Sequence, residues 1–330
     1  MILDTTHSLN FVLNSLQADR DTFEAYINSP DQSRFFRITT RRKRDGERTI
    51  HEPQGDALQS IYKNLYEKLI EYQVFLPEYV HGFVKGRSPY TNAEAHLAKK
   101  FILNLDISNF FEHIKIETVE ATFLRLGAQP DVAQALAKFC TVNGVLPQGT
   151  HTSPDIANHC FSDIDQLLST YASTHDLTYT RYADDMTFSS DTRIKASDII
   201  AIIESTGKYT VAPQKVKLQK RGANQYVTGL TIFDDQQPRI SKLYKKRLRL
   251  ELYYLDKYGL ESLAARSPKL GEQPDPESAE YAAWMTQKEE LIRTRLGHLR
   301  GRVNYINSIE PDLAKKMWPI LDKITDGHEG

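Results

Sequence analysis

The sequence predicts an α+β fold divided into two or three packed subdomains. Apolar residues recur at helical spacing within 8–28, where one side carries Leu9, Val12, Leu13 and Leu16. Further along the chain, two β-like runs rich in Thr, Tyr and Phe enclose a pair of acids. The length of 330 residues exceeds one average domain, and an apolar fraction of 40% supports a real core.

Helical periodicity and turn residues place the other elements in chain order. Residues 37–53 are expected to form a hairpin that turns at Asp45-Gly46. The helices expected after it span 57–72, 88–99, 115–126, 130–140 and 154–172. In the last of these, Pro154 suits the first helical turn, with Ser153 as its cap.

Residues 236–330 change character, because basic residues alternate with leucines at helical spacing. The basic residues of the first such helix are Lys242, Lys245, Lys246, Arg247 and Arg249, and those of the second are Arg293, Arg295, Arg300 and Arg302. A solvated face explains any single residue as well as RNA binding does, but explains the whole set less well. Between the helices, 262–280 is rich in Pro and reads as a loop, either a linker or a partner surface.

The most informative string is Tyr182-Ala183-Asp184-Asp185, at the tip of the second expected hairpin. Two adjacent carboxylates on a tight turn repel each other unless a cation lies between them. Hard oxygen ligands suit Mg²⁺. A solvated Asp-Asp turn is the simpler explanation, so this string alone only suggests a metal site.

A third carboxylate strengthens the metal interpretation. The apolar run 101–106 reads as a short strand that ends on Asp106, with Ile107 directly after it at the same expected metal site. A strand that ends in an acid beside a hairpin with two more acids is suited to two Mg²⁺ ions, which together stabilise both oxygens of a phosphoryl transfer. Taken by itself, Asp106 is equally well explained as a strand-end cap.

Two aromatic residues follow this acid. Phe111 lies five residues after Asp106, where the chain is expected to pass a bound nucleotide sugar. A bulky ring there can block a 2′-hydroxyl and so select deoxynucleotides. Ordinary core packing is the alternative for Phe111, and it is the role expected of Phe110.

Several motifs in order make the chain similar to the bacterial retron reverse transcriptases. The palm motifs of that family resemble Asp106 with Phe110-Phe111, then 146–154, then 182–185. Three further strings narrow the resemblance: Asn92-Ala-Glu-Ala-His96, Val227-Thr228-Gly229, and Arg48-Thr49-Ile50 with Pro53. The likeness covers about residues 35 to 305.

This resemblance implies a right-hand polymerase with an N-terminal helix and fingers over 1–100, a palm with inserted fingers helices over 101–235 and a helical thumb over 236–330. It implies an RNA-directed DNA polymerase that uses two Mg²⁺ ions on Asp106, Asp184 and Asp185. The expected template and primer is a cognate non-coding RNA (msr-msd) that yields msDNA, with synthesis starting from a guanosine 2′-hydroxyl. A role in antiphage defence with an effector protein is also implied.

The resemblance also assigns binding residues. Those expected to contact the nucleotide are Lys43, Arg48, Phe111, Gln148 and Lys215. Those expected to contact RNA are Asn92, His96, Val227, Thr228, Gly229, Lys245, Lys246 and Arg249. A helix cap and a surface histidine are the plain alternatives for Asn92 and His96, which share a helical face at i and i+4.

The chain departs from the family pattern at two places. Thr150-His151-Thr152 stands where the family commonly has Ala-Pro-Ser or Ala-Pro-Thr, so the contacts of that loop are open. The family's Asn ahead of a basic residue is missing around Lys215 and Lys217, which leaves open which of these lysines approaches the triphosphate.

Composition narrows the remaining choices. The net charge of −1 means that nucleic acid must be held by local basic clusters. Cys140 and Cys160 lack metal-ligand spacing, which argues against a zinc site and fits a reducing cytoplasm. The sequence shows no apolar run of membrane-spanning length and no signal peptide. The alternatives are a defence-associated reverse transcriptase with different priming, or a non-catalytic RNA-binding scaffold for an effector.

Overall fold

The computed structural model describes residues 1–43, 46–262 and 270–326, and the chain divides into two compact units. The first unit is Met1–Thr228 and the second is Gly229–Gly330. The last boundary expected from the sequence, between 235 and 236, lies a few residues further along the chain.

The N-terminal segment forms two helices rather than the single helix expected over 8–28. Helix α1 spans Leu9–Ser15 and helix α2 spans Arg20–Ile27. Gln17 separates them with a φ of 51°, a left-handed conformation that a continuous helix does not tolerate. Asp19 then caps α2 by accepting a hydrogen bond from the Thr22 amide at 2.7 Å.

The expected fingers hairpin is present. Strand β1 (Phe36–Lys43) pairs antiparallel with β2 (Gly46–Pro53), in a register that sets Arg41 opposite Arg48. The turn expected at Asp45-Gly46 lies partly outside the described residues. Helix α3 (Asp56–Leu69) follows and continues into the 3₁₀ helix η2 (Ile70–Phe75), close to the helix expected over 57–72.

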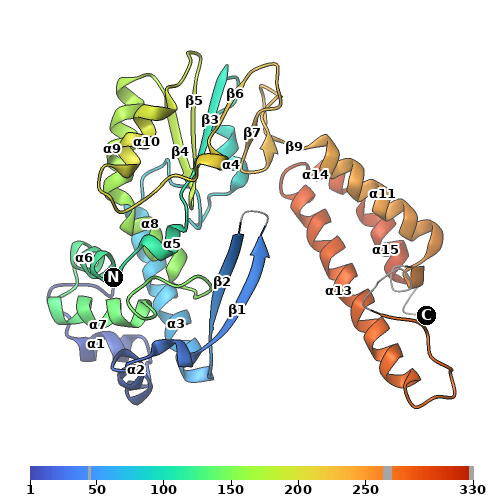
Figure 1. Ribbon diagram of the computed structural model, residues 1–330, viewed down its shortest axis with the longest axis horizontal. Coiled ribbons are helices and arrows are strands. Elements are labelled where there is room, and N and C mark those ends of the chain that lie inside the picture. The colour runs from blue at the N-terminus through green and yellow to red at the C-terminus, as the bar shows by residue number, and fades with distance from the viewer. Residues whose placement is uncertain (44–45, 263–269, 327–330) are drawn as a thin grey trace. The chain divides into compact units, whose positions relative to one another are not determined.

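A four-stranded antiparallel sheet forms the centre of the first unit, in the order β4-β5-β3-β6 (Figure 1). Its strands are β3 (Phe101–Asp106), β4 (Thr178–Tyr182), β5 (Asp185–Ser190) and β6 (Lys217–Lys220). One face carries buried apolar side chains such as Leu103, Leu105 and Met186. Because side chains alternate along a strand, the other face carries the acids and a row of polar residues.

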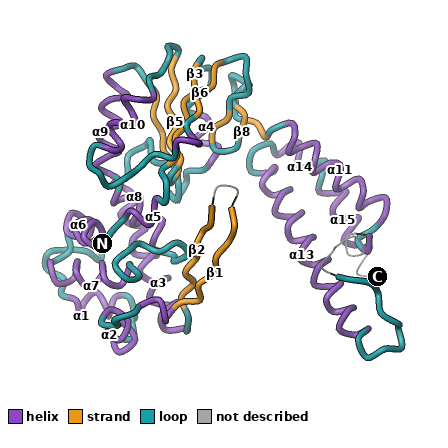
Figure 2. Tube along the Cα trace, viewed as in Figure 1, coloured by secondary structure: helices purple, strands orange, loops and turns teal. Residues whose placement is uncertain are grey.

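The remaining helices of this unit contribute to its core, and Figure 2 shows some of them beside the sheet and others next to α1 and α2. They are α4 (Pro89–Glu94), α5 (Phe110–His113), α6 (Ile116–Arg125), α7 (Pro130–Cys140), α8 (Ser153–Cys160), α9 (Ser162–Thr174) and α10 (Ala196–Glu204). The 3₁₀ helices η1 (Gln32–Phe35) and η3 (Pro213–Lys215) and strand β7 (Tyr226–Val227) complete the unit.

Two helical expectations in this unit need correction. The helix expected over 154–172 is broken at Phe161, which separates α8 from α9. Ser153 lies inside α8 instead of capping it, and its Oγ lies 2.7 Å from Thr150 Oγ1. Helix α4 ends at Glu94 rather than at 99, and Ala98 follows with a φ of 61°.

The second unit is mostly helical. Strands β8 (Leu230–Thr231) and β9 (Arg239–Ile240) pair antiparallel, and the helices are α11 (Lys242–Tyr258), α13 (Tyr281–Asn307), α14 (Pro311–Ala314) and α15 (Trp318–Asp326). Of the loop expected over 262–280, residues 263–269 lie outside the described part. Across the described ranges, the structure contains no helix with the length and apolar character that crossing a membrane requires.

Candidate active site

Three acids meet at one end of the central sheet. Asp106 ends β3 and lies directly opposite Asp185, the first residue of β5. Asp184 belongs to the two-residue connection between β4 and β5, and its carbonyl accepts a hydrogen bond from the Ile107 amide at 3.1 Å. Directly opposed residues of an antiparallel pair have neighbouring side chains on one face. The three acids that the sequence singled out are therefore brought together.

The acids strongly affect one another. Burial, and then the negative charges of Asp106 and Asp184, raise the pKa of Asp185 to about 7. Lys215, from η3, opposes this shift and donates a hydrogen bond from Nζ to Asp106 Oδ1 at 2.7 Å. The cluster holds more negative charge than one lysine compensates, which favours an added cation.

The donor set fits a hard divalent cation such as Mg²⁺, since carboxylate oxygens are its preferred protein ligands. In the described ranges, no group of three or more His, Cys, Asp or Glu side chains is arranged so that it could hold a metal ion by itself. The acids thus form an open set to which other oxygen ligands would be added. Ile107, also expected at this site, has a buried side chain and can contribute only through its backbone.

The expected nucleotide contacts lie on several elements of the first unit. The His51 amide on β2 donates to the Gln148 carbonyl at 2.6 Å, and Gly149 packs so closely that a Cβ there would lie 2.7 Å from Ile50 Cγ2. Gly149 also has a φ of 112°, so glycine is required on both counts. These contacts join the Gln148-Gly149 turn to the fingers hairpin.

Arg48, Lys43 and His151 differ in burial and in whether the structure describes their side chains. Arg48 is partly buried, and its Nε is buried without a hydrogen-bond partner in the described part of the chain. The side chain of Lys43 lies outside the described residues. His151 is exposed, with its ring centre 6.5 Å from that of Tyr66.

The two phenylalanines after Asp106 differ in burial. Phe110 is buried and contacts the rings of Phe161 and Tyr209, which is the core role expected of it. Phe111 is only partly buried, with its ring centre 5.5 Å from that of Phe110. This partial exposure leaves the ring available beside a nucleotide.

The direct RNA contacts expected of Asn92 and His96 need correction, because both side chains are completely buried. His96 bridges two strands, with Nδ1 2.7 Å from Ser189 Oγ and Nε2 2.7 Å from Thr180 Oγ1. Burial lowers the pKa of His96 to about 3, so the ring is neutral. His96 therefore supports the polar face of the sheet, and neither side chain lies on a surface that RNA can touch.

The Val227-Thr228-Gly229 string lies where the two units join in sequence. Val227 is buried, so its side chain is not available to RNA as expected. Thr228 and Gly229 have φ values of 46° and 80°, and Thr228 Oγ1 donates to the Pro89 carbonyl at 3.0 Å. A left-handed conformation is costly for a β-branched residue, so this hydrogen bond has a structural role in holding the turn.

The basic helix of the second unit is only partly available to RNA. Lys245 is partly buried and pairs with Glu310 at 3.0 Å, which offsets its charge. Lys246 and Arg249 are exposed and line, with Lys242, Lys245 and Leu250, a hollow of about 370 Å³. In the same unit, Arg295 and Arg302 both pair with Glu251. Lys246 and Arg249 therefore remain candidates for phosphate contacts.

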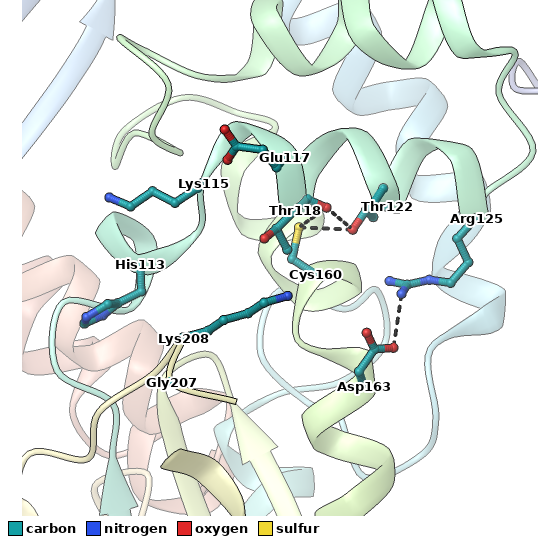
Figure 3. Close-up of a pocket in the computed structure, with 11 residues that line it drawn as sticks. His113, Lys115, Glu117, Thr118, Thr122, Arg125, Cys160, Asp163, Gly207 and Lys208 are labelled. Carbon is teal, nitrogen blue, oxygen red and sulfur yellow. Dashed lines mark hydrogen bonds and ion pairs between the residues drawn. The ribbon is translucent and has the colours of Figure 1, made fainter. Parts of the chain in front are cut away.

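A larger cavity of about 480 Å³ lies beside α6 and α8 (Figure 3). Lys115, Arg125 and Lys208 line it, and Arg125 pairs with Asp163 at 3.2 Å. At its inner wall, Cys160 Sγ accepts a hydrogen bond from Thr122 Oγ1 at 3.3 Å. The cavity does not include the acids of the candidate site.

The sequence reasoning missed a buried polar group beneath the acids. Arg181 directly precedes Tyr182, is completely buried and pairs with Asp165. Its position alternates with Thr180 and Tyr182 along β4, so it points to the apolar side of the sheet. An arginine at a core-facing position of a strand is the signal that marks it.

Comparison with known proteins matches the part of the chain that carries the candidate acids. Residues 43–236 match the family model described as reverse transcriptase (RNA-dependent DNA polymerase). The chain belongs to this reverse transcriptase family. It is 32% identical over 230 residues to the retron Ec86 reverse transcriptase of Escherichia coli, covering 67% of this chain and 70% of that protein.

A second retron relative extends this result. The retron Ec83 reverse transcriptase of Escherichia coli is 23% identical, with 92% of both chains covered. Together these relatives identify a bacterial retron-type reverse transcriptase with an α+β polymerase fold. Among solved structures, apo telomerase from Candida tropicalis matches with a TM-score of 0.46 and 13% identity, over 70% of this chain and 60% of that one.

Proposed function

We propose that this reverse transcriptase joins deoxynucleotides at Asp106, Asp184 and Asp185 with the help of two Mg²⁺ ions. The observation that carries the proposal is the direct opposition of Asp106 and Asp185 beside the turn residue Asp184. Two ions held there would stabilise the attacking and the leaving oxygen of the phosphoryl transfer. The raised pKa of Asp185 is consistent with this assignment, since it reflects burial first and then the negative charges of Asp106 and Asp184, which a cation would compensate.

The remaining residues bind and orient the nucleotide in this proposal. Lys215 neutralises Asp106 while no cation is present, and its ammonium lies close enough to the acids to reach phosphate oxygens once a cation replaces it. Arg48 and Gln148 line the fingers side, where the unpartnered Arg48 Nε suits a phosphate oxygen. Phe111 limits the room beside the sugar.

A matched pair of variants tests the catalytic assignment. Asp185→Asn is expected to abolish DNA synthesis on an RNA template while leaving RNA binding intact. The control is Asp163→Asn, an exposed acid on α9 whose loss is expected to leave synthesis unchanged. Near-parental synthesis by Asp185→Asn in Mg²⁺ would refute the assignment of these acids, whereas RNA binding without any synthesis by the parent would favour a non-catalytic RNA-binding scaffold.

We further infer that the template is a structured non-coding RNA, from which the enzyme makes msDNA primed by a guanosine 2′-hydroxyl. The support is the similarity to retron reverse transcriptases, together with a net charge of −1 that gives no general attraction for RNA. Sequencing nucleic acid that copurifies with the protein tests this inference. A single RNA joined to DNA through a 2′–5′ linkage is expected, whereas a mixture of cellular RNAs would favour different priming.

An antiphage role with an effector protein is the last part of the proposal, and it rests on the retron resemblance. Cells that carry the complete locus are expected to resist phage, and Asp185→Asn is expected to remove that resistance. Resistance that persists without synthesis would separate defence from polymerisation.

A further inference from the structure

A buried guanidinium reaches the turn that presents the candidate acids. Arg181 is 0% exposed, and it donates to both oxygens of Asp165, from Nε at 2.8 and 3.1 Å and from Nη2 at 2.6 Å. Its Nη1 then donates to Asn158 Oδ1 and to the Ala183 carbonyl, both at 3.0 Å. One side chain thus connects α8, α9 and the turn between β4 and β5.

Two aromatic residues complete the buried surroundings of this ion pair. The Tyr179 hydroxyl donates to Asp165 Oδ1 at 2.6 Å, and the Phe161 ring centre lies 5.0 Å from Arg181 Cζ. A buried ion pair is weak evidence for stability, because desolvation offsets most of its attraction. What apolar side chains could not supply is the directed hydrogen bond to Ala183.

The turn needs this support from its backbone. Ala183 has a φ of 58°, a left-handed conformation that is strained for a non-glycine residue. Its carbonyl is held by Arg181, and the carbonyl of Asp184 is held from the other side by the Ile107 amide. Both peptide units that orient Asp184 are therefore fixed.

The loop that contains His81 and Gly82 packs against the same turn. The His81 amide donates to the Arg181 carbonyl at 2.7 Å, and Asn158 Nδ2 donates to the Gly82 carbonyl at 2.8 Å. A Cβ on Gly82 would lie 2.3 Å from the Ala183 nitrogen, so only glycine fits there. Asn158 thus links this loop to Arg181.

We propose that Arg181 is a positioning residue of nucleotide addition, which acts through the Ala183 carbonyl to hold Asp184 and Asp185 in the arrangement that binds the cations. The inference rests on the proposed function of these two acids. A shift of the turn by a fraction of an ångström is enough to weaken catalysis, since reacting groups tolerate little misplacement.

The test compares two substitutions on the same strand at the same depth. Arg181→Lys keeps a positive charge beside Asp165, but an ammonium lacks the fork that also reaches Asn158 and Ala183. Tyr179→Phe is the control, because it removes one hydrogen bond to Asp165 and none to the turn. Both are measured by thermal stability, by kcat and KM for a deoxynucleotide, and by the Mg²⁺ concentration at half-maximal rate.

Arg181→Lys is expected to lower kcat about tenfold or more and to raise the half-saturating Mg²⁺ concentration, with the deoxynucleotide KM little changed. Tyr179→Phe is expected to lose stability but to keep the parental kcat and Mg²⁺ dependence. A readout besides activity is Fe²⁺-dependent hydroxyl-radical cleavage of the chain near Asp106 and Asp184. It is expected in the parent and in Tyr179→Phe, and to weaken in Arg181→Lys.

Gly82→Ala is the alternative variant to be measured if Arg181→Lys does not fold. It displaces the same turn from the other side without removing a charge, and the same changes in kcat, Mg²⁺ dependence and cleavage are expected. Its control is Gly297→Ala, on α13, where a Cβ meets open space.

Asp184→Asn separates the two proposals. The positioning role is overturned, and the proposed function stands, if Asp184→Asn is inactive but Arg181→Lys behaves like its control in all readouts. If Arg181→Lys does not fold, Gly82→Ala is judged in the same way. If Asp184→Asn retains synthesis, both fail.

Discussion

Lys215 donates a hydrogen bond from Nζ to Asp106 Oδ1 at 2.7 Å, so a lysine neutralises the acid that ends the central strand. This pair answers the question of which lysine approaches the site. Lys217 lies on β6, opposite Asn104, and is exposed. The side chain near the acids is therefore that of Lys215.

Replacing Lys215 is expected to slow nucleotide addition. Lys215→Ala removes the ammonium beside the acids and is expected to lower kcat/KM for deoxynucleotides about tenfold or more, because charge aimed at the reacting phosphate is lost. Lys217→Ala is the matched control and is expected to stay near the parental value. Single-nucleotide extension kinetics measure both, and equal losses would contradict the assignment.

Removing the ring of Phe111 is expected to weaken selection against ribonucleotides. Phe111→Ala opens space beside the sugar, so the kcat/KM ratio of ribonucleotide to deoxynucleotide is expected to rise. Phe110→Leu, in the core, is expected to reduce stability and leave that ratio unchanged. An unchanged ratio in Phe111→Ala would show that its ring only packs.

The two exposed basic side chains of α11 named above, Lys246 and Arg249, are expected to contact RNA phosphates. Replacing Lys246 or Arg249 with Ala is expected to reduce the slope of log affinity against log salt by about 0.7 to 0.9 per contact. Lys245→Ala is expected to leave the slope unchanged and to lower stability, since Lys245 pairs with Glu310. RNA binding measured across a salt series checks this, and equal slopes for all three variants would refute it.

Acid is expected to destabilise the protein through His96. Burial lowers its pKa to about 3, while the unfolded chain keeps an ordinary value near 6.5. The unfolded state therefore binds more protons between these values, and stability rises with pH across that window. Through His96, the free energy of unfolding is expected to rise by about 2 kcal/mol from pH 5 to pH 7.5.

The matching experiment measures unfolding of the parent and of His96→Gln at both pH values. The destabilisation caused by the substitution is expected to be larger at pH 7.5 than at pH 5. A penalty that does not change with pH would mean that His96 is charged in the folded protein.

Neither cysteine is expected to react with thiol reagents in the folded protein. Cys140 is completely buried, and burial raises the pKa of Cys160 to about 12, so the reactive thiolate is scarce. Both are expected to react once the chain is unfolded in denaturant. Rapid modification of Cys160 in the native protein would show that the cavity beside α6 opens to solvent.

The sequence by itself located the candidate acids, because a strand that ends in Asp106 and a hairpin tip at Asp184-Asp185 are local patterns. Amphipathic spacing located the helices that became α3, α6 and α7 in the same way. Helix breaks were missed at Gln17 and Phe161, since periodicity continues across a change in backbone direction.

Only the tertiary structure decided what the polar residues outside these patterns do. Spacing predicted that Asn92 and His96 share a helical face, but α4 ends at Glu94, and both side chains are buried in the folded chain. A basic stripe on α11 did not reveal that Glu310, 65 residues after Lys245, would neutralise one of its members. The hydrogen-bonded group of Arg181, Asp165 and Asn158 could likewise not be predicted from the sequence. Burial and charge pairing depend on residues distant in sequence, and those become neighbours only when the chain folds.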